Sequence, residues 1–484
     1  MARSHRRAST STRHTTLIVA VSLALGRAVA QTPSPSLFDA DLLSKVSSLA
    51  ATTATPDEWP EYTGTNGQWA LQPETDWTSG FFPSSLFYLY SRTLLCPEDT
   101  AGADWLSLAR TWSAALYNPA QEDYSSWTHD VGFASAPMEE ELKINPSNET
   151  ARTALLANAQ VLAERYSSAV GCTRSWDRGA GDFEVIIDNM MNLQLLIQAA
   201  GLSGNSTYTD MAVSHAKKTA QNHVRADGSS FHVVDYSPST GKVQWQGTAQ
   251  GLSNSSTWSR GQAWGILGFA LMANATGNTE FLDVSRRMAT FFLDGLPDAG
   301  VSYWDFKATA PTTLDTSAST IAASALLVLS SLETSLGNTT AAASWSNSAI
   351  TLLNNVVEQG VNSWSGASIV GNGTVNNRAD PPNNNTGIVY GDAHFLLSGN
   401  HLLQLGLANC TNGQPAVGAS PSALSSTLFS SSGSSGNSSS SAGSSSDGDA
   451  GTSSGGGGNA GARGAGTPVG LFRALGRVAR ALRR

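Results

Sequence analysis

The chain has 484 residues, enough for one large domain or two of medium size, and its 28 basic and 37 acidic residues give a formal net charge of −9. Many basic residues lie near the two ends, so the stretch from 31 to 418 is more acidic than the total charge suggests. A negative field repels nucleic acid and other long polyanions, which argues against a nucleic-acid partner.

The first thirty residues have the pattern of a secretory signal peptide. Arg3, Arg6 and Arg7 precede the apolar run "LIVAVSLAL", and "AVA" ending at Ala30 has the small residues of a signal-peptidase site. The run is too short to span a membrane, and no later segment approaches the roughly 18 apolar residues of a spanning helix. We therefore expect a signal peptide over 1–30, no spanning segment, and a protein that is secreted and extracellular or associated with the cell wall.

Sequons and cysteines are the next features that bear on export. Nine Asn-x-Ser/Thr triplets without proline predict a glycosylated surface. The three cysteines, Cys96, Cys172 and Cys410, allow at most one intramolecular disulfide, and all three pairings are open. The sequons begin at Asn148, Asn205, Asn254, Asn274, Asn338, Asn372, Asn384, Asn409 and Asn437.

The body of the chain, from 31 to 418, has mostly helical patterns. Some predicted helices, such as "ARTALLANAQVLAERY", are amphipathic, whereas "VIIDNMMNLQLLI" and "TIAASALLVLSSL" are apolar or small on every side. Helices of the second kind are normally enclosed by others, which predicts an inner ring wrapped by an outer one. In "FHVVDYSPSTGKVQW", two alternating runs flank a turn and predict a β-hairpin between Phe231 and Trp245.

Six stretches of the body begin with polar or aromatic residues and continue into small or apolar sequence. They are separated by about 50–80 residues, which is room for a helical hairpin with its loops. We therefore predict an all-α fold over 31–418, an (α/α)6 barrel of six helical hairpins with a small β-hairpin insertion. The N-terminal ends of the inner helices would meet at one mouth of the barrel. The stretches begin at Asp76, Thr128, Glu184, Trp258, Asp315 and Tyr390.

The composition changes abruptly beyond the body. Residues 419–466 are dominated by Ser and Gly, which predicts a disordered stalk because such sequence cannot bury apolar area. Residues 467–484 form a basic tail in which leucines and arginines recur at helical spacing. The tail is either an amphipathic helix that contacts a membrane or cell-wall surface, or a frayed end or gene-model error; Gly470 and Gly476 favour the latter.

Two carboxylates stand at the heads of predicted inner helices. Asp188 has apolar neighbours, so desolvation should raise its pKa and leave an acid able to donate a proton near neutral pH. The alternative is an Asp bonded to a neighbouring helix end. Asp130 would raise the proton affinity of Asp188 at a shared mouth, unless it only caps its own helix. Because paired acids are typical of glycoside hydrolases, we predict Asp188 and Asp130 as the catalytic pair.

Aromatic residues in the same motifs point to a sugar ligand. Trp77, Trp258 and Trp264 have flat apolar faces that can stack on pyranose rings, although a core position is the alternative for each. Arg260 is a candidate partner for a substrate carboxylate, and its alternative is an inter-helix salt bridge.

Signatures of metal, nucleotide and serine-hydrolase chemistry are missing from the sequence. The chain has no HExxH, CxxC, glycine-rich phosphate loop or G-x-S-x-G. We therefore expect neither a metal nor an organic cofactor. His232 on the predicted hairpin and Gln250 could reach the mouth if the hairpin folds over it.

Taken in their order along the chain, these motifs resemble the unsaturated glucuronyl hydrolases, glycoside hydrolase family 88. The resemblance spans Leu37 to Leu407 and includes "DWTSGFFPSSLFYLY", "HDVGFA", "GDFEVIIDNMMNLQLL" and "GLSNSSTWSRGQAWGILGFAL". It implies an (α/α)6 barrel and hydration of the C4=C5 bond of a 4,5-unsaturated uronic acid, which polysaccharide lyases leave at a non-reducing end. The implied substrates are small unsaturated uronyl oligosaccharides.

The resemblance also implies roles for individual residues. Asp188 would protonate C4 and then accept a proton from the water that adds to C5, after which the hemiketal opens and releases the rest of the sugar. Asp130 would hold ring hydroxyls and keep the proton on Asp188. The residues at matching positions that line the pocket are Trp77, His129, His232, Gln250, Trp258, Arg260 and Trp264.

Two positions depart from the family pattern, and two other functions compete. Ala249 and Leu314 stand where members often have His and Arg, which leaves the aglycone preference and tolerance of sulfate open. One alternative is an unsaturated rhamnogalacturonyl hydrolase that acts on pectin fragments with the same barrel and chemistry. The other is a non-catalytic, secreted glycan-binding wall protein, which the presence of both acids disfavours.

Overall fold

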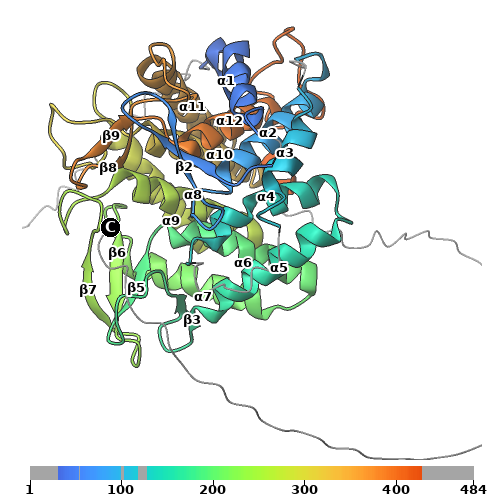
Figure 1. Cartoon of the computed structure of the whole chain (residues 1–484). Helices are drawn as coiled ribbons and strands as arrows, with labels where there is room; N and C mark the ends of the chain where they lie inside the picture. The colour runs from blue at the N-terminus through green and yellow to red at the C-terminus, as the bar shows by residue number, and fades with distance from the viewer. Residues whose placement is uncertain (1–30, 54, 100–102, 118–127, 428–484) are drawn as a thin grey trace, which may run out of the picture. The chain divides into compact units, whose positions relative to one another are not determined.

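The computed structural model describes residues 31–53, 55–99, 103–117 and 128–427 (Figure 1). The predicted signal peptide (1–30), most of the predicted stalk and the basic tail (467–484) lie outside these ranges. The sequon at Asn437 lies outside them as well.

Six helices in the described part form a closed inner ring. Each inner helix contacts the next inner helix along the chain, and the last, α12, contacts the first, α2, so the ring is closed. Most of their side chains are buried, and in α8 and α10 nearly all of them are. This matches the apolar patterns of the sequence, because a helix enclosed by neighbours has no face to give to water. The inner helices are α2 (Phe81–Leu95), α4 (Val131–Ile144), α6 (Asn189–Ser203), α8 (Ser259–Thr276), α10 (Thr316–Ser335) and α12 (Val389–Gln404).

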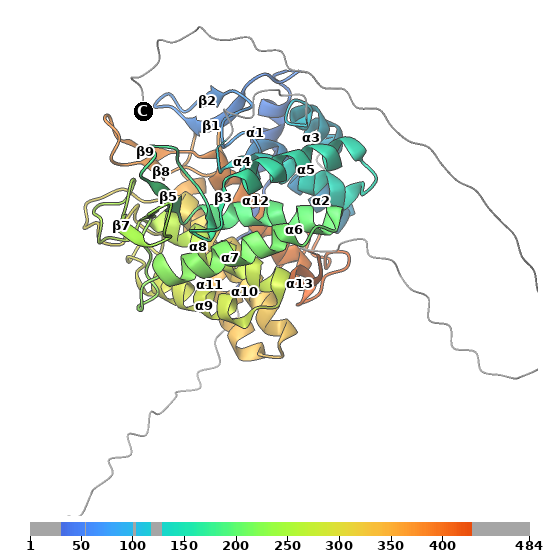
Figure 2. The ribbon, with the colours of Figure 1, turned by 90° about the horizontal axis from the view of Figure 1, so that it is seen from below.

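Amphipathic helices wrap this ring. Each of the first five inner helices is followed by an outer helix that packs back against it, and Figure 2 shows several of these pairs side by side. In α9, for example, Phe281, Met288 and Phe292 are buried, whereas Glu280 and Arg287 are not. These outer helices are α3 (Trp105–Ser113), α5 (Glu149–Glu164), α7 (Thr207–Asn222), α9 (Thr279–Asp294) and α11 (Thr339–Val356).

The sixth outer helix comes from the other end of the chain. Helix α1 (Ala40–Ala50) buries Leu42 and Val46 in the common core, and its residues line a small cavity together with residues of α2 and α12. The predicted (α/α)6 barrel is confirmed, but its sixth pair joins the N-terminal α1 to the C-terminal α12 instead of forming a consecutive hairpin.

A disulfide between Cys96 and Cys410 reinforces this closure. Cys96 follows α2 and Cys410 follows α12, so the bond links two neighbouring helices that are separated by 314 residues of sequence. Cys172 is free and buried. The pairing left open by the sequence is therefore Cys96–Cys410.

A three-stranded antiparallel sheet lies beside the barrel, in the order β5 (Phe183–Ile186), β6 (Val233–Tyr236) and β7 (Val243–Gly247). Strands β6 and β7 are the predicted hairpin. Strand β5 corrects the sequence interpretation, which had assigned Val185 and Ile186 to an inner helix. These β-branched residues pair with Val234 and Val233, and the helix begins only after Asp188, because cross-strand packing outweighs the local helical pattern.

Two further hairpins were not predicted from the sequence: β1 (Trp59–Thr63) with β2 (Trp69–Gln72), and β8 (Gly373–Asn376) with β9 (Asn383–Thr386). They meet where Tyr62 bridges Ile388, just before α12. Two-residue strands β3 (Tyr166–Ser167) and β4 (Cys172–Thr173) also pair. The remaining elements are η1 (Pro35–Phe38), η2 (Pro97–Asp99), the π-helix η4 (Val357–Val361) and α13 (Ala423–Thr427).

In the described ranges, α10 is the one helix long and apolar enough to cross a membrane by length and composition. Of its most apolar 18-residue stretch, 94% is buried inside the protein, as expected for a core helix.

Candidate active site

The beginnings of α4 and α6 carry the two predicted catalytic acids. Asp130 and Asp188 are the N-cap residues, yet neither side chain bonds the amides of its own helix in the described structure. Two of the outer helices differ in this respect, since Asn148 and Asn278 accept hydrogen bonds from the first turns of α5 and α9. The helix-cap alternative for Asp130 is therefore not what the structure shows, and both carboxyls are available for another purpose.

Asp188 is buried, and one of its carboxyl oxygens has no partner. Only 8% of the residue is exposed, and Oδ2 forms no hydrogen bond within the described part of the chain. The pKa of Asp188 is raised to about 7, mainly by burial and also by the charge of Asp130, while the charge of Arg260 opposes the shift. A substantial fraction of Asp188 is thus a neutral acid near pH 7.

Asp130 lies in a comparable environment. Its pKa is raised to about 7, mainly by burial; a hydrogen bond from Asn192 opposes the shift, and the charge of Asp76 contributes to it. Nε2 of His129 lies 3.1 Å from Oδ1 of Asp130. Burial lowers the pKa of His129 to about 3, so this ring is neutral and does not form a charged pair with the acid.

His232 is the ring beside the proposed proton donor. Its Nε2 lies 3.6 Å from Oδ2 of Asp188, and its Nδ1 accepts the backbone N–H of Ala249 at 3.3 Å. Because that N–H can only donate, Nδ1 carries no proton and the hydrogen of the neutral ring is on Nε2, facing Asp188. Burial and then the charge of Arg260 lower the pKa of His232 well below its usual value, so it is a neutral donor.

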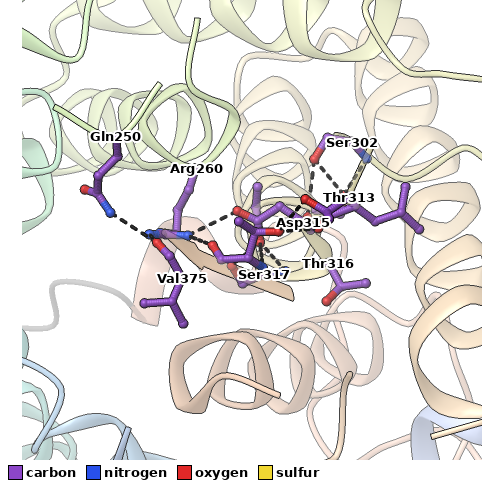
Figure 3. A network of polar contacts seen from close by, with 12 residues as sticks. Gln250, Arg260, Ser302, Thr313, Asp315, Thr316, Ser317 and Val375 are labelled. Atoms are coloured by element: carbon purple, nitrogen blue, oxygen red, sulfur yellow. Dashed lines mark hydrogen bonds and ion pairs between the residues drawn. The ribbon is translucent and has the colours of Figure 1, made fainter. Parts of the chain in front are cut away.

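Arg260 is held by the protein itself (Figure 3). Its Nη1 lies 3.1 Å from Oδ2 of Asp315, and the guanidinium also donates to the carbonyls of Thr374 and Val375 in β8. Arg260 and Asp315 are both almost completely buried. The inter-helix salt bridge, the alternative raised from the sequence, is therefore present between α8 and α10.

Gln250 joins this network from the loop after β7. Its Nε2 donates to the Val375 carbonyl at 3.2 Å, the same oxygen that accepts from Arg260 (Figure 3). The β8–β9 hairpin is thereby attached to both predicted substrate-binding residues. The N-terminal turn of α10 is fixed as well, because Asp315 accepts the backbone N–H groups of Ser317 and Ala318.

The three predicted tryptophans occupy different depths. The ring of Trp258 lies 4.4 Å from that of His232, and the guanidinium carbon of Arg260 lies 4.5 Å from the centre of the Trp258 ring, so Trp258 is part of the mouth. Trp77 is partly buried and contacts Tyr390 at 5.2 Å. Trp264 is fully buried between Phe133 and His394, which agrees with the core alternative.

Three residues that contact the predicted site residues or the helices that carry the acids were not assigned a role from the sequence. Asp315 orients Arg260, and the Asp-x-Ser pattern of a helix cap was the available signal. Asn192 lies one turn after Asp188 on α6 and accepts from the backbone of Phe133 on α4, which ties the two acid-bearing helices together. Tyr390 is buried, and the guanidinium carbon of Arg260 lies 5.2 Å from the centre of its ring. No spacing in the sequence indicated this contact.

Potential metal ligands gather at one place in the described ranges. The group consists of Cys96, Asp99 and Cys410, and its two sulfurs are already joined in the disulfide. It lies outside the site of the two acids.

No model of a protein family matches the chain. Among curated proteins, the chain is 36% identical over 340 residues to the unsaturated glucuronyl hydrolase of Formosa agariphila, which covers 67% of this chain and 79% of that protein. It is 35% identical over 281 residues to the unsaturated glucuronyl hydrolase of Bacillus sp. strain GL1, covering 57% of this chain and 72% of that protein.

Solved structures give the same result at the level of the fold. The crystal structure of the unsaturated glucuronyl hydrolase from Bacillus sp. GL1 superposes with a TM-score of 0.66 at 27% identity, covering 76% of this chain and 94% of that one. An unsaturated glucuronyl hydrolase specific for heparin superposes with a TM-score of 0.69 at 28% identity, covering 78% of this chain and 99% of that one. With similarity in sequence over most of the barrel and the same closed ring of helices, the chain belongs to the unsaturated glucuronyl hydrolases and is a glycoside hydrolase.

Proposed function

We propose that the protein hydrates the C4=C5 bond of a 4,5-unsaturated uronic acid at the non-reducing end of an oligosaccharide made by a polysaccharide lyase. The observation that carries this proposal is the buried Asp188 carboxyl, which has a pKa of about 7 and an oxygen, Oδ2, that accepts no hydrogen bond from any described group. Such a group is an acid and a base at the same pH, which hydration requires in succession.

In the first step the π electrons of the double bond take the proton of Asp188 to form the C4–H bond. Positive charge develops at C5 and is stabilised by the ring oxygen. Water then adds to C5 and gives a proton to the Asp188 carboxylate, which restores the acid. The product is a hemiketal that opens and releases the rest of the sugar.

The surrounding residues would support both states of Asp188. When Asp188 is charged, the Nε2–H of His232 faces it and stabilises the anion. Asp130 would hold ring hydroxyls and, by its charge, keep the proton on Asp188 before the reaction. The other residues that we propose to line the pocket are Trp77, His129, Gln250 and Trp258, whereas Trp264 packs in the core beneath them.

Arg260 has a different role in this proposal from a direct clamp on the substrate. Its donors are directed to Asp315 and two carbonyls, so a bidentate grip on a uronate carboxylate would need these bonds to break. Its positive charge still lowers the pKa of Asp188 through space. We therefore propose that Arg260 acts mainly through its charge and through Trp258, against which it stacks.

Names of the relatives suggest where to look for the substrate. The relative in Streptococcus pyogenes is an unsaturated chondroitin disaccharide hydrolase, and the Bacillus enzyme is described as responsible for degradation of glycosaminoglycan. Another solved relative is a complex with dGlcA-Glc-Rha-Glc. These names support unsaturated products of glycosaminoglycans, and of polysaccharides that combine glucuronic acid with glucose and rhamnose, as the first candidates.

A panel of lyase products tests the proposal. Hydration destroys the conjugated double bond, so ultraviolet absorbance should fall and mass spectrometry should detect the released aglycone. Products from heparin, chondroitin, glucuronan, ulvan, xanthan and pectin should be compared at equal concentration. Turnover of pectin products alone would favour a rhamnogalacturonyl hydrolase, and binding of the panel without turnover would favour a glycan-binding protein.

We also propose that the protein is exported. The signal pattern of 1–30, the sequons and the Cys96–Cys410 disulfide support this, because disulfides persist in oxidising compartments. N-terminal sequencing and glycan analysis of protein recovered from culture medium test it; a chain that stays inside the cell and retains residues 1–30 would contradict it. Contact of the basic tail with a cell-wall or membrane surface remains a separate proposal, tested by binding of the full and tail-deleted chains.

A further inference from the structure

Trp245 is a large aromatic residue on the outside of the protein. It lies on the outer strand β7 and is 41% exposed, although tryptophan is usually buried to a greater extent. The strand pairing puts it opposite Asp235 of β6, so the two side chains share one face of the sheet.

The indole ring leans along β7 toward the active-site mouth. A methyl group placed on Gly247 would come within 2.3 Å of the indole Cζ2, so the absence of a side chain at Gly247 makes the space that the ring occupies. The Gly247 carbonyl accepts the backbone N–H of His232, and the next two residues, Thr248 and Ala249, contact the His232 ring. The exposed indole therefore lies against the start of the segment 247–249, which contacts His232 beside Asp188.

Polar groups flank the indole on the same face. Nε2 of Gln244 lies 3.3 Å from Oδ2 of Asp235, and the other carboxylate oxygen of Asp235 accepts the N–H of Phe183. A flat apolar surface next to a carboxylate and an amide matches a sugar ring, which presents C–H groups on its face and hydroxyls at its rim. A sulfate or a second uronate would instead meet the negative charge of Asp235.

We propose that Gln244, Trp245 and Asp235, which we call the Trp245 face, bind a neutral sugar residue of the substrate beyond the unsaturated uronic acid. The inference rests on the proposed function and adds a preference to it. Oligosaccharides long enough to reach the Trp245 face bind more tightly than the unsaturated disaccharide, provided that the distal residue is neutral.

The test compares unsaturated di- and tetrasaccharides prepared with one lyase from a polysaccharide that contains neutral hexoses. For the wild-type protein, kcat/KM should be about tenfold higher for the tetrasaccharide than for the disaccharide. Removing one indole face from water on binding should increase the affinity by about this factor. Trp245→Ala should abolish this difference and leave the disaccharide rate unchanged, whereas Trp245→Tyr should keep most of it. A tetrasaccharide sulfated on its distal sugar should have a kcat/KM close to that of the disaccharide.

Val243→Ala is the matched control. Val243 lies on the same strand, is 39% exposed, and pairs with Tyr236 on the opposite face of the sheet. It should leave the ratio of the two rates unchanged. Equal wild-type rates for the two substrates, or equal effects of Trp245→Ala and Val243→Ala, would overturn the inference, while lack of turnover of every disaccharide would overturn the proposed function instead.

Self-association is the other use of an exposed tryptophan, and sedimentation distinguishes it. The wild-type protein and Trp245→Ala should have the same mass in solution. A dimer that Trp245→Ala converts to a monomer, with no change in the ratio of rates, would assign the face to a second copy of the chain and overturn the sugar-binding role.

Discussion

Asp188 combines three properties that few surface carboxylates share: burial, a neighbouring acid that raises its pKa, and an oxygen that accepts no hydrogen bond from any described group. The His232 ring beside it is neutral, and its Nε2–H faces the Asp188 carboxylate when that group is charged. These properties make the residue suited to give a proton and take one back in the same cycle.

Replacement of Asp188 by Asn removes the proton donor while keeping the shape of the side chain. We expect kcat for an unsaturated disaccharide to fall by about 100-fold or more. The circular dichroism spectrum and melting temperature should stay close to those of the wild type. Asp210→Asn, on the outer helix α7, is the control and should retain full activity; near-normal activity of Asp188→Asn would show that another group is the acid.

Asp130 should control the pH dependence of the reaction. Because the acid form of Asp188 is required, kcat/KM should fall as the pH rises through about 7. The charge of Asp130 raises the pKa of Asp188, so Asp130→Asn should move this fall to lower pH. A pH–rate profile of both proteins measures the shift, and an unchanged profile would mean that the two acids are not coupled.

At the scale of elements, strand pairing explains how Asp188 reaches His232. Ile186 pairs with Val233, and the N–H of Ile187 donates to the His232 carbonyl. The chain then enters α6 directly, with Asp188 as its N-cap residue. The sheet that corrected the helical interpretation of this stretch is thus also the element that brings the acid and the ring together.

Helices α8 and α10 and the β8–β9 hairpin depend on one buried ion pair. Asp315→Asn would leave the Arg260 charge without its carboxylate in a buried environment and should lower the free energy of unfolding by about 3 kcal/mol. Activity should fall as well, because Asp315 orients Arg260, whose charge acts on Asp188 and which shares the Val375 carbonyl with Gln250. Urea unfolding and disaccharide turnover measure the two effects.

The control for this substitution is an exposed ion pair of similar length. Asp283 bonds Arg286 on α9, but its side chain is 66% exposed. Asp283→Asn should therefore change the free energy of unfolding by less than about 1 kcal/mol. Equal effects of the two substitutions would contradict the structural role assigned to Asp315.

At the scale of the molecule, the disulfide secures a ring whose ends are far apart in sequence. Cys96–Cys410 restricts the unfolded chain, so its removal in the double variant Cys96→Ser and Cys410→Ser should lower the free energy of unfolding by about 3–5 kcal/mol. Thermal unfolding with and without reductant measures this. Reductant should destabilise the wild type and leave the double variant unchanged; an effect on both would point to another cause.

The inner ring and the positions of the two acids could be predicted from the sequence because they depend on local patterns. A helix that is apolar on all sides must be enclosed, and a carboxylate at its head must lie at the mouth. The hairpin of β6 and β7 was also predictable, since its alternation and turn lie within one short stretch.

The remaining features depend on contacts between distant segments, which a single sequence does not encode in its local patterns. Only the folded chain pairs Val185 with Val234, joins Cys96 to Cys410 and directs Arg260 to Asp315. The sequence by itself determined the helical class, the closed ring and the two acids. The tertiary structure decided which partners neutralise the buried charges and which oxygen of Asp188 stays free, because desolvation and hydrogen bonding act only once those segments meet.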